Sequence, residues 1–356
     1  MSWPEAPVVV RVPATSANLG PGFDCLGLAL ALHDVVTARI TGRGLDIAVS
    51  GVGEPAAAAG DEHLVIRAMR AGFAALGRQP PGIAISCRNA IPQGYGLGSS
   101  AGAIVAGLLA ARGLAGEAAI AQLPDVALLR LAAELDGHPD NVAACLAGGL
   151  TIAWTSAAGA RSVRLSPLPG LAPVICLPPE PLATAAARRA LPPAVPHPDA
   201  AQNSARAALL VAGLTGHPDL LMDATEDFLH QRYRAAVMPR TASLIAALRA
   251  AGIPAVVSGA GPAVLALTLA GHRPGAGAAA SIAAAEGAGW HASPLGVDAQ
   301  GATMQRLRGP RRSAQNRAGA AAGAGAPAAG RQAATADLAV AGSSASSSTS
   351  RTSLTG

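Results

Sequence analysis

The stretch PQGYGLGSSAG at residues 92–102 runs directly into Ala, Ile, Val and Leu residues at helical spacing, so a glycine-rich loop must open straight into a helix. Gly94, Gly96 and Gly98 allow the backbone to come close to an anion. The first N–H groups of the helix have no partner within it, and its macrodipole adds positive charge there. The sequence therefore predicts a phosphate site, followed by two serines that either cap the helix or face the phosphate or Mg²⁺.

The basic residues exclude several classes of phosphate site. All 26 of them are arginine, because the sequence contains no lysine. A Walker A loop, the strand lysine of a protein kinase and a Schiff-base enzyme each need an ammonium group at a fixed place. The net charge of +5 could suit a nucleic acid, but aromatic residues make up only 2% and the densest arginine cluster lies near the C-terminus. No nucleic-acid partner is expected.

We expect a cytoplasmic protein. Glu5, Arg11 and several prolines stand where a signal peptide would need an apolar run. No segment has the ~18 uninterrupted apolar residues that a membrane span requires, so no membrane partner is expected. The four cysteines show neither a CxxC pair nor metal-ligand spacing, a pattern typical of reduced, buried thiols.

Short β-rich stretches alternate with helical patterns along the chain, without the long parallel βαβ regularity of a Rossmann sheet. This alternation predicts an α+β fold. Prolines punctuate the middle of the chain and place a domain boundary there, so we expect a first domain over residues 1–165 and a second over 166–304. From residue 305 the composition collapses to Ala, Gly, Ser, Thr and Arg. A disordered low-complexity tail is therefore expected over 305–356.

Two further segments carry side chains that suit an amino-acid ligand. PATSANLGPGFDCLGLAL, residues 13–30, holds Asn18 and Asp24 among glycines between two apolar strands. It forms either a tight hairpin loop or a binding loop. Arg188 and Arg234 lie in the second half of the chain, and an arginine can grip a carboxylate with two parallel hydrogen bonds.

The segment ELDGHPDN contributes further candidates. Glu134 stands at the end of a long Ala/Leu helix, where a carboxylate is either solvated or a donor to Mg²⁺ held with nucleotide phosphates. His138, Asp140 and Asn141 share the turn that follows. As a bare cluster they cap a helix or belong to a site, and composition alone does not separate the two.

Taken together and in this order, these segments resemble the GHMP kinases. PQGYGLGSSAG is similar to that family's phosphate loop P-x-x-x-G-L-G-S-S-A, and SGAGPAV to its glycine-rich third motif. PATSANLGPGFDCLG resembles the homoserine kinases within the family, and the likeness covers residues 8–304. Gly102 stands where a second alanine is common. Gln231 and Arg232 replace a frequent Glu-Pro, which leaves open whether Arg232 or Arg234 is the ligand.

The resemblance implies a GHMP kinase fold. Its N-terminal domain would be similar to ribosomal protein S5 domain 2, its C-terminal domain would be ferredoxin-like, and ATP and substrate would lie between them. The implied reaction transfers the γ-phosphoryl group of ATP to the hydroxyl of L-homoserine and gives O-phospho-L-homoserine, a step of threonine biosynthesis. A homodimer is the expected assembly.

The resemblance also implies roles for individual residues. Ser100 and Glu134 would face Mg²⁺, and Asn141 and Thr184 would lie near the reacting atoms. The residues implied around homoserine are Asn18, Asp24, His138, Arg188 and Arg234. Those implied around the nucleotide phosphates are Pro92, Gln93, Gly94, Tyr95, Gly96, Leu97, Gly98, Ser99, Ser100 and Ala101.

Asn141 bears on the mechanism, because mevalonate kinase-type relatives have an aspartate at the matching position and a lysine beside it. An asparagine cannot accept a proton, and this chain contains no lysine. Phosphoryl transfer depends more on positioning and charge neutralisation than on a strong base. The hydroxyl proton is therefore expected to pass to a γ-phosphate oxygen. The alternatives are another small-molecule GHMP kinase and a GHMP-fold protein that binds nucleotide without catalysis.

Overall fold

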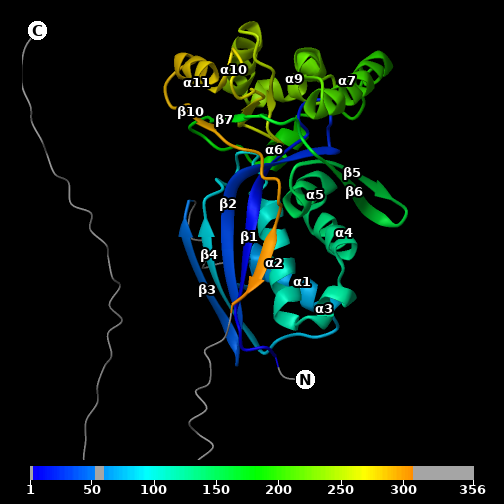
Figure 1. The fold of residues 1–356 in the computed structure, drawn as a ribbon, viewed down its shortest axis with the longest axis vertical. Coiled ribbons are helices and arrows are strands. Elements are labelled where there is room, and N and C mark those ends of the chain that lie inside the picture. The colour runs from blue at the N-terminus through cyan, green and yellow to red at the C-terminus, as the bar shows by residue number, and fades with distance from the viewer. Residues whose placement is uncertain (1–2, 53–59, 308–356) are drawn as a thin grey trace, which may run out of the picture. The chain divides into compact units, whose positions relative to one another are not determined.

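The computed structural model describes residues 3–52 and 60–307, which form two sheets and the helices packed on them (Figure 1). The long hairpin of β1 (Val8–Ala17) and β2 (Leu26–Thr41) belongs to the first sheet, and it also packs against the half of the chain that contains the second sheet. In its first part Val8, Val10 and Val12 are buried and Arg11 is exposed, as in a strand with one covered face. From Pro13 onward every residue of β1 is buried. The far end of the hairpin is therefore covered on both faces.

The first sheet has the order β11-β1-β2-β4-β3, and a second hairpin extends it from β2. β3 (Gly44–Gly51) runs parallel to β4 (Gly82–Asn89), and the other pairings are antiparallel. The extending hairpin is β5 (Leu150–Ser156) and β6 (Gly159–Leu165). β11 (Thr303–Arg306) brings the last described residues back beside β1. The first sheet thus contains residues from both ends of the described chain.

Helices cover one face of this sheet, and α2 (Ser99–Ala115) lies at their centre. Its apolar residues point in all directions, as expected for a helix surrounded by protein. A Cβ on Gly107 would lie 2.5 Å from the Val65 carbonyl oxygen, so glycine allows α1 and α2 to pack closely. The other helices of this layer are α1 (Leu64–Ala75), α3 (Ala118–Gln122), α4 (Asp125–Asp136) and α5 (Pro139–Ala147).

The second sheet is antiparallel with the order β10-β7-β9-β8. Its strands are β7 (Val174–Leu177), β8 (Ala255–Val257), β9 (Val264–Ala266) and β10 (His291–Pro294). The accompanying helices are α6 (Thr184–Arg189), α7 (His197–Thr215), α8 (Leu221–Ala224), α9 (Gln231–Arg234), α10 (Pro239–Ala250) and α11 (Ala276–Ala285), with 3-10 turns at Pro218–Leu220 and Ala235–Val237. Leucines of the β1–β2 hairpin and of this half share one apolar core.

The α+β prediction is confirmed, and the helix after the glycine loop begins at Ser99 as expected. The division into 1–165 and 166–304 stays a prediction. The boundary of the tail needs a correction, because Gln305 and Arg306 belong to β11. They pair with β1 and are held by it. Residues 308–356 of the expected tail lie outside the described part.

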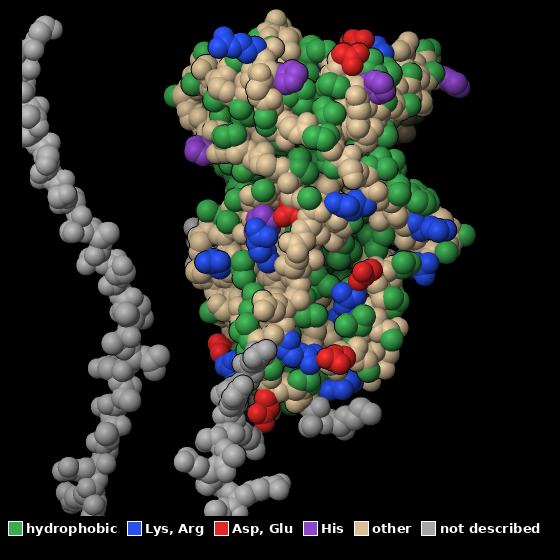
Figure 2. Space-filling view, in the orientation of Figure 1, with side chains coloured by type: hydrophobic (Ala, Val, Ile, Leu, Met, Phe, Trp, Pro, Cys, Tyr) green, Lys and Arg blue, Asp and Glu red, His purple; other side chains and the backbone are tan. Residues whose placement is uncertain are grey.

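The distribution of surface charge bears on nucleic-acid binding, and the length of the helices bears on membrane insertion. Arginines on the face shown in Figure 2 are spread among acidic and apolar side chains. None of the helices in the described ranges is long and apolar enough to cross a membrane.

Deleting residues 308–356 should leave the melting temperature within about 2 °C of the full chain, because the segment has few residues able to join a core. Deleting 303–356 should lower it much further. That deletion removes β11, whose Arg306 donates to the Gly113 carbonyl and whose Met304 packs on the same glycine. Thermal unfolding of the full chain and of the two deletion variants measures these melting temperatures. Equal decreases in melting temperature from both deletions would contradict the prediction.

Candidate active site

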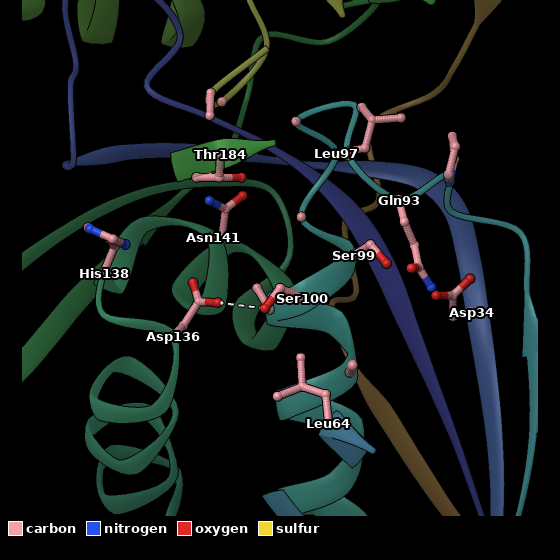
Figure 3. A pocket seen from close by; sticks show the side chains of 18 of the residues that line it. Asp34, Leu64, Gln93, Leu97, Ser99, Ser100, Asp136, His138, Asn141 and Thr184 are labelled. Carbon is pink, nitrogen blue, oxygen red and sulfur yellow. Dashed lines mark hydrogen bonds between the residues drawn. The ribbon is translucent and has the colours of Figure 1, made fainter. Parts of the chain in front are cut away.

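A cavity of about 570 Å³ opens where the glycine loop, the start of α2 and the turn before α5 meet loops of the second half of the chain (Figure 3). It collects nearly all the residues singled out in the sequence. Those that line it are Asn18, Asp24, Pro92, Gln93, Gly94, Gly96, Leu97, Gly98, Ser99, Ser100, Ala101, His138, Asn141, Thr184, Arg188 and Arg234. Tyr95 and Glu134 do not line it. The Tyr95 hydroxyl instead donates to the Pro179 carbonyl.

The glycine loop has a shape that only glycine permits. Gly94, Gly96 and Gly98 have φ values of 78°, 76° and 69°. A Cβ on Gly96 would lie 2.1 Å from the Ser258 carbonyl oxygen, and one on Gly98 would lie 1.9 Å from Thr15 Oγ1. These glycines are therefore needed for contacts within the protein as well as for access to an anion. Contacts within the protein therefore determine the loop's conformation.

The start of α2 faces the cavity without a side-chain cap. Gly98 is its N-cap residue, and neither serine that follows caps the helix. Ser99 and Ser100 are instead its first two residues, and Figure 3 shows both at the cavity. A 17-residue helix thus presents uncapped N–H groups and the positive end of its dipole to this space. Such an arrangement binds phosphate without lysine.

Asp136, and not Glu134, contacts this helix start. Ser100 Oγ donates to Asp136 Oδ1 at 3.2 Å, whereas Glu134 is exposed. Residues two apart on a helix point in nearly opposite directions, so only one of the two can face Ser100. Burial raises the pKa of Asp136, which the Ser100 hydrogen bond partly opposes. The sequence feature that marks Asp136 is its position directly before Gly137, the glycine at which α4 ends.

The Asn18–Asp24 segment is a tight loop that also lines the cavity, and its role as a binding loop stays a prediction. Asn18 and Asp24 adopt left-handed conformations, with φ of 67° and 52°. Asn18 Nδ2 donates to the Gly259 carbonyl at 2.8 Å, and its Oδ1 accepts from the Asp24 N–H at 2.9 Å. The Asn18 side chain is thus a structural tie between this loop and the Ser258–Gly261 turn.

The two predicted arginines differ in their surroundings. Arg188 Nη2 lies 3.1 Å from Asp24 Oδ1, and both side chains of this ion pair are about one-third exposed, at 37% and 35%. Arg234 is buried, and burial, with Arg188 nearby, lowers its pKa to about 10, so it is still a cation at neutral pH. Arg232 pairs with Asp199 at the surface and does not line the cavity. The geometry therefore favours Arg234 over Arg232 as the candidate ligand of the substrate.

Asn141 is fixed by its neighbours at the start of α5. Its Oδ1 accepts from Thr15 Oγ1 at 2.8 Å, and its backbone N–H donates to Asp140 Oδ1 at 2.7 Å. Asp140 is buried, and desolvation, together with Asp24 and Asp136, raises its pKa to about 7. Figure 3 shows Thr184 and Asn141 facing the same space. The Asn141 amide is thus held by Thr15 and Asp140, since its Nδ2 also lies 3.4 Å from Asp140 Oδ1.

Part of the cavity wall was not singled out in the sequence. Besides Asp136, it includes Asp34, Glu62, His63, Leu64, Val65, Cys87, Asn89 and Ala103. Asp34 Oδ1 accepts from the N–H groups of Ala90 and Ile91 at 2.6 and 2.9 Å and so fixes the approach to the glycine loop. No motif marks these residues, because strands and helices far apart in the sequence bring them together.

The described residues contain no cluster of three or more His, Cys, Asp or Glu side chains that could hold a metal ion alone. A cation here would need oxygens from a bound ligand as well. Ser100 and Asp136 offer a hydroxyl and a carboxylate of the kind that Mg²⁺ takes when it is held with phosphates.

The sequence of this chain is similar to known protein families and to individual proteins. Residues 63–149 match the N-terminal domain of the GHMP kinases, and residues 204–286 match their C-terminal domain. A homoserine kinase of Streptomyces coelicolor is 52% identical over 304 residues, which are 85% of this chain and 96% of that protein. One from Leifsonia xyli is 47% identical over 303 residues, 84% of this chain and 92% of that protein.

Solved structures of kinases are also similar to this chain. A homoserine kinase from Cytophaga hutchinsonii matches with a TM-score of 0.72 and 27% identity, over 86% of this chain and 99% of that one. A mevalonate kinase from L. major, at 14% identity and a TM-score of 0.60, shares the fold over 82% of this chain and 96% of that one.

Replacing Asp140 by Asn should stabilise the protein at pH 8 and have little effect at pH 4. The folded-state pKa of about 7 lies above the ordinary value of 3.8, so the folded protein binds a proton more tightly and loses this stability as pH rises from about 4 to 7. Each pKa unit corresponds to about 1.4 kcal/mol, so the difference is a few kcal/mol at most. Asparagine cannot ionise and still accepts from the Asn141 N–H.

Urea unfolding of both proteins at the two pH values measures this effect. A free-energy difference between them that is the same at pH 4 and pH 8 would show that Asp140 does not titrate in this way.

Proposed function

Because this chain belongs to the homoserine kinases, a branch of the GHMP kinase family, we propose that its cavity holds ATP and L-homoserine side by side and that the residues lining it carry out the transfer. The enzyme transfers the γ-phosphoryl group of ATP to the homoserine hydroxyl and forms O-phospho-L-homoserine, a step of threonine biosynthesis. One observation carries the site assignment. An uncapped helix start and a cluster of Asp24, Arg188 and Arg234 line the same cavity.

The phosphates of ATP are assigned to the glycine loop and the start of α2. Backbone N–H groups there replace the lysine that other nucleotide sites use. They are fixed in place by the loop's contacts with Thr15 and Ser258, so little reorganisation is needed when the nucleotide binds.

Mg²⁺ is assigned to Ser100 and Asp136, in place of the predicted pair of Ser100 and Glu134. Asp136 contacts Ser100 at the cavity, and Glu134 points away from it. When bound with the phosphates, Mg²⁺ would neutralise part of their charge. Asp136 would then be a carboxylate, because a nearby cation favours its ionised form.

The acceptor is assigned to Asp24, Arg188 and Arg234. Asp24 and Arg188 form an ion pair at the cavity. The homoserine ammonium would take the place of Arg188 beside Asp24, and its carboxylate would take the place of Asp24 beside Arg188 and Arg234. Each buried or half-buried charge keeps an opposite charge during this exchange. A zwitterion achieves it without leaving a charge unpaired, which supports an amino-acid acceptor.

Asn141 and Thr184 are assigned to the reacting hydroxyl. Neither side chain can take up a proton at neutral pH. They would hold the hydroxyl in line with the γ-phosphorus, while its proton passes to a phosphate oxygen. His138 lines the same part of the cavity, and burial, with Arg188 nearby, lowers its pKa, so the ring is neutral at pH 7.

The cytoplasmic location and the homodimer stay predictions. Light scattering on purified protein, with and without ATP, would give the oligomeric state.

An ADP-release assay tests the acceptor assignment. L-Homoserine should be phosphorylated far faster than serine, mevalonate or shikimate, because only homoserine combines a zwitterion with a hydroxyl at the right reach. Comparable rates with mevalonate would contradict the zwitterion site.

Asp136→Asn and Ser100→Ala should each lower kcat by ~10²–10³ at saturating Mg²⁺, the scale for losing one charge-stabilising group. Glu134→Gln is the matched control and should stay within about 2-fold, because its side chain is exposed. Steady-state kinetics with a Mg²⁺ titration measures both effects. A large loss of kcat in Glu134→Gln, with normal kcat in Asp136→Asn, would contradict this assignment and favour Ser100 and Glu134 as the residues that face Mg²⁺.

Arg188→Leu should raise the homoserine KM by ~10-fold or more and leave the ATP KM nearly unchanged, since it removes a charged partner of the carboxylate. Arg189→Leu, the next residue along α6, is the control. Equal effects on both substrates would place Arg188 on the phosphate side.

A further inference from the structure

His230 lies outside the cavity and connects two of its walls. The residue is fully buried, and it directly precedes α9, which carries Arg234. Its Nδ1 is 3.0 Å from Arg234 Nη1, and its Nε2 is 2.9 Å from the carbonyl oxygen of Gly20 in the Asn18–Asp24 loop. The ring thus links the buried arginine to the loop that carries Asp24.

The two partners fix the protonation state of the ring. An arginine can only donate and a carbonyl oxygen can only accept, so Nδ1 must accept and Nε2 must carry the hydrogen. Burial lowers the pKa of His230, in agreement with a neutral ring. The Asp227 carboxylate accepts from the backbone N–H groups of His230 and Gln231 at 3.0 and 2.6 Å, which fixes the backbone at this point.

The same contacts determine which part of Arg234 is left for a ligand. Its Nε donates to the Ala187 carbonyl, and its Nη1 donates to His230 and to the Gly259 carbonyl. Among the hydrogen bonds within the described ranges, Nη2 makes none. The Phe23 ring lies 5.5 Å from the guanidinium and 5.1 Å from the His230 ring, so the group is enclosed on that side. The two N–H groups of Nη2 are those that remain for the cavity.

We propose that His230 is a positioning residue for the phosphoryl acceptor. By accepting from Nη1 it fixes the rotation of the Arg234 guanidinium, so that Nη2 faces the acceptor carboxylate. By donating to Gly20 it keeps the loop with Asp24 at the matching distance. This inference rests on the proposed role of Arg234 in binding homoserine.

Three substitutions separate the two hydrogen bonds. His230→Asn places an oxygen near the position of Nδ1 and keeps the contact with Arg234. His230→Gln places an N–H near the position of Nε2 and keeps the contact with Gly20. His230→Phe keeps the packing on Phe23 and loses both hydrogen bonds. The same substitutions at His217, which is exposed after α7, serve as controls.

His230→Gln and His230→Phe should raise the homoserine KM by ~10-fold or more with the ATP KM within about 2-fold, and His230→Asn, which loses only the contact with Gly20, should raise the homoserine KM by less than His230→Gln does. Steady-state kinetics and melting temperatures are measured together. If His230→Phe does not fold, the comparison of Asn with Gln decides. Homoserine and ATP KM values that rise together, or that follow only the melting temperature, would overturn the proposal.

Arg234→Leu distinguishes failure of this inference from failure of the site assignment. If Arg234→Leu leaves the homoserine KM unchanged, the carboxylate site itself is misassigned and His230 has nothing to position. If Arg234→Leu raises it and the His230 variants do not, the inference about His230 alone fails. In the double variant with Arg234→Leu, His230→Gln should add no further increase in the homoserine KM, because its effect acts through Arg234.

Discussion

The glycine loop keeps its shape because neighbouring segments occupy the space that side chains at Gly96 and Gly98 would need. Thr15 on β1 fills one position and the Ser258 carbonyl fills the other. The Thr15 N–H also donates to the Leu97 carbonyl at 3.0 Å, and Ser258 Oγ lies 2.8 Å from the Gly96 carbonyl oxygen. Residues from two distant parts of the chain thus hold one loop, and α2 begins directly after it, at the cavity and without a side-chain cap. The remaining features of the site are arranged around this helix start.

Charges in the site are buried only where another group offsets the cost. Arg234 has backbone carbonyls and His230 as acceptors, and Arg188 has Asp24. Within the described residues Asp140 makes no ion pair, and desolvation raises its pKa to about 7. The cations named above are therefore paired with groups of the protein. A ligand with both charges can replace these pairs, whereas a ligand with one charge leaves a group unpaired.

The sequence could predict the parts of the site that local chemistry determines. Alternating glycines before an apolar helix predict a phosphate loop, and the helix does begin at Ser99. The choice between Glu134 and Asp136 needed the rotation of α4 relative to α2, which tertiary packing sets. His230 carried no motif, because its role depends on a ring that meets Gly20, 210 residues earlier. β11 was missed for a related reason, since the pairing with β1 stabilises a strand of low apolar content.

The central claim is that the cavity recognises a zwitterion through Asp24, Arg188 and Arg234. The most direct measurement compares kcat/KM for L-homoserine with that for two analogues of the same reach, 3-aminopropan-1-ol without the carboxylate and 4-hydroxybutyrate without the ammonium. Each analogue should lose ~10²-fold or more, since it leaves one charged side chain without its partner. A value for 4-hydroxybutyrate close to that for L-homoserine would contradict the account.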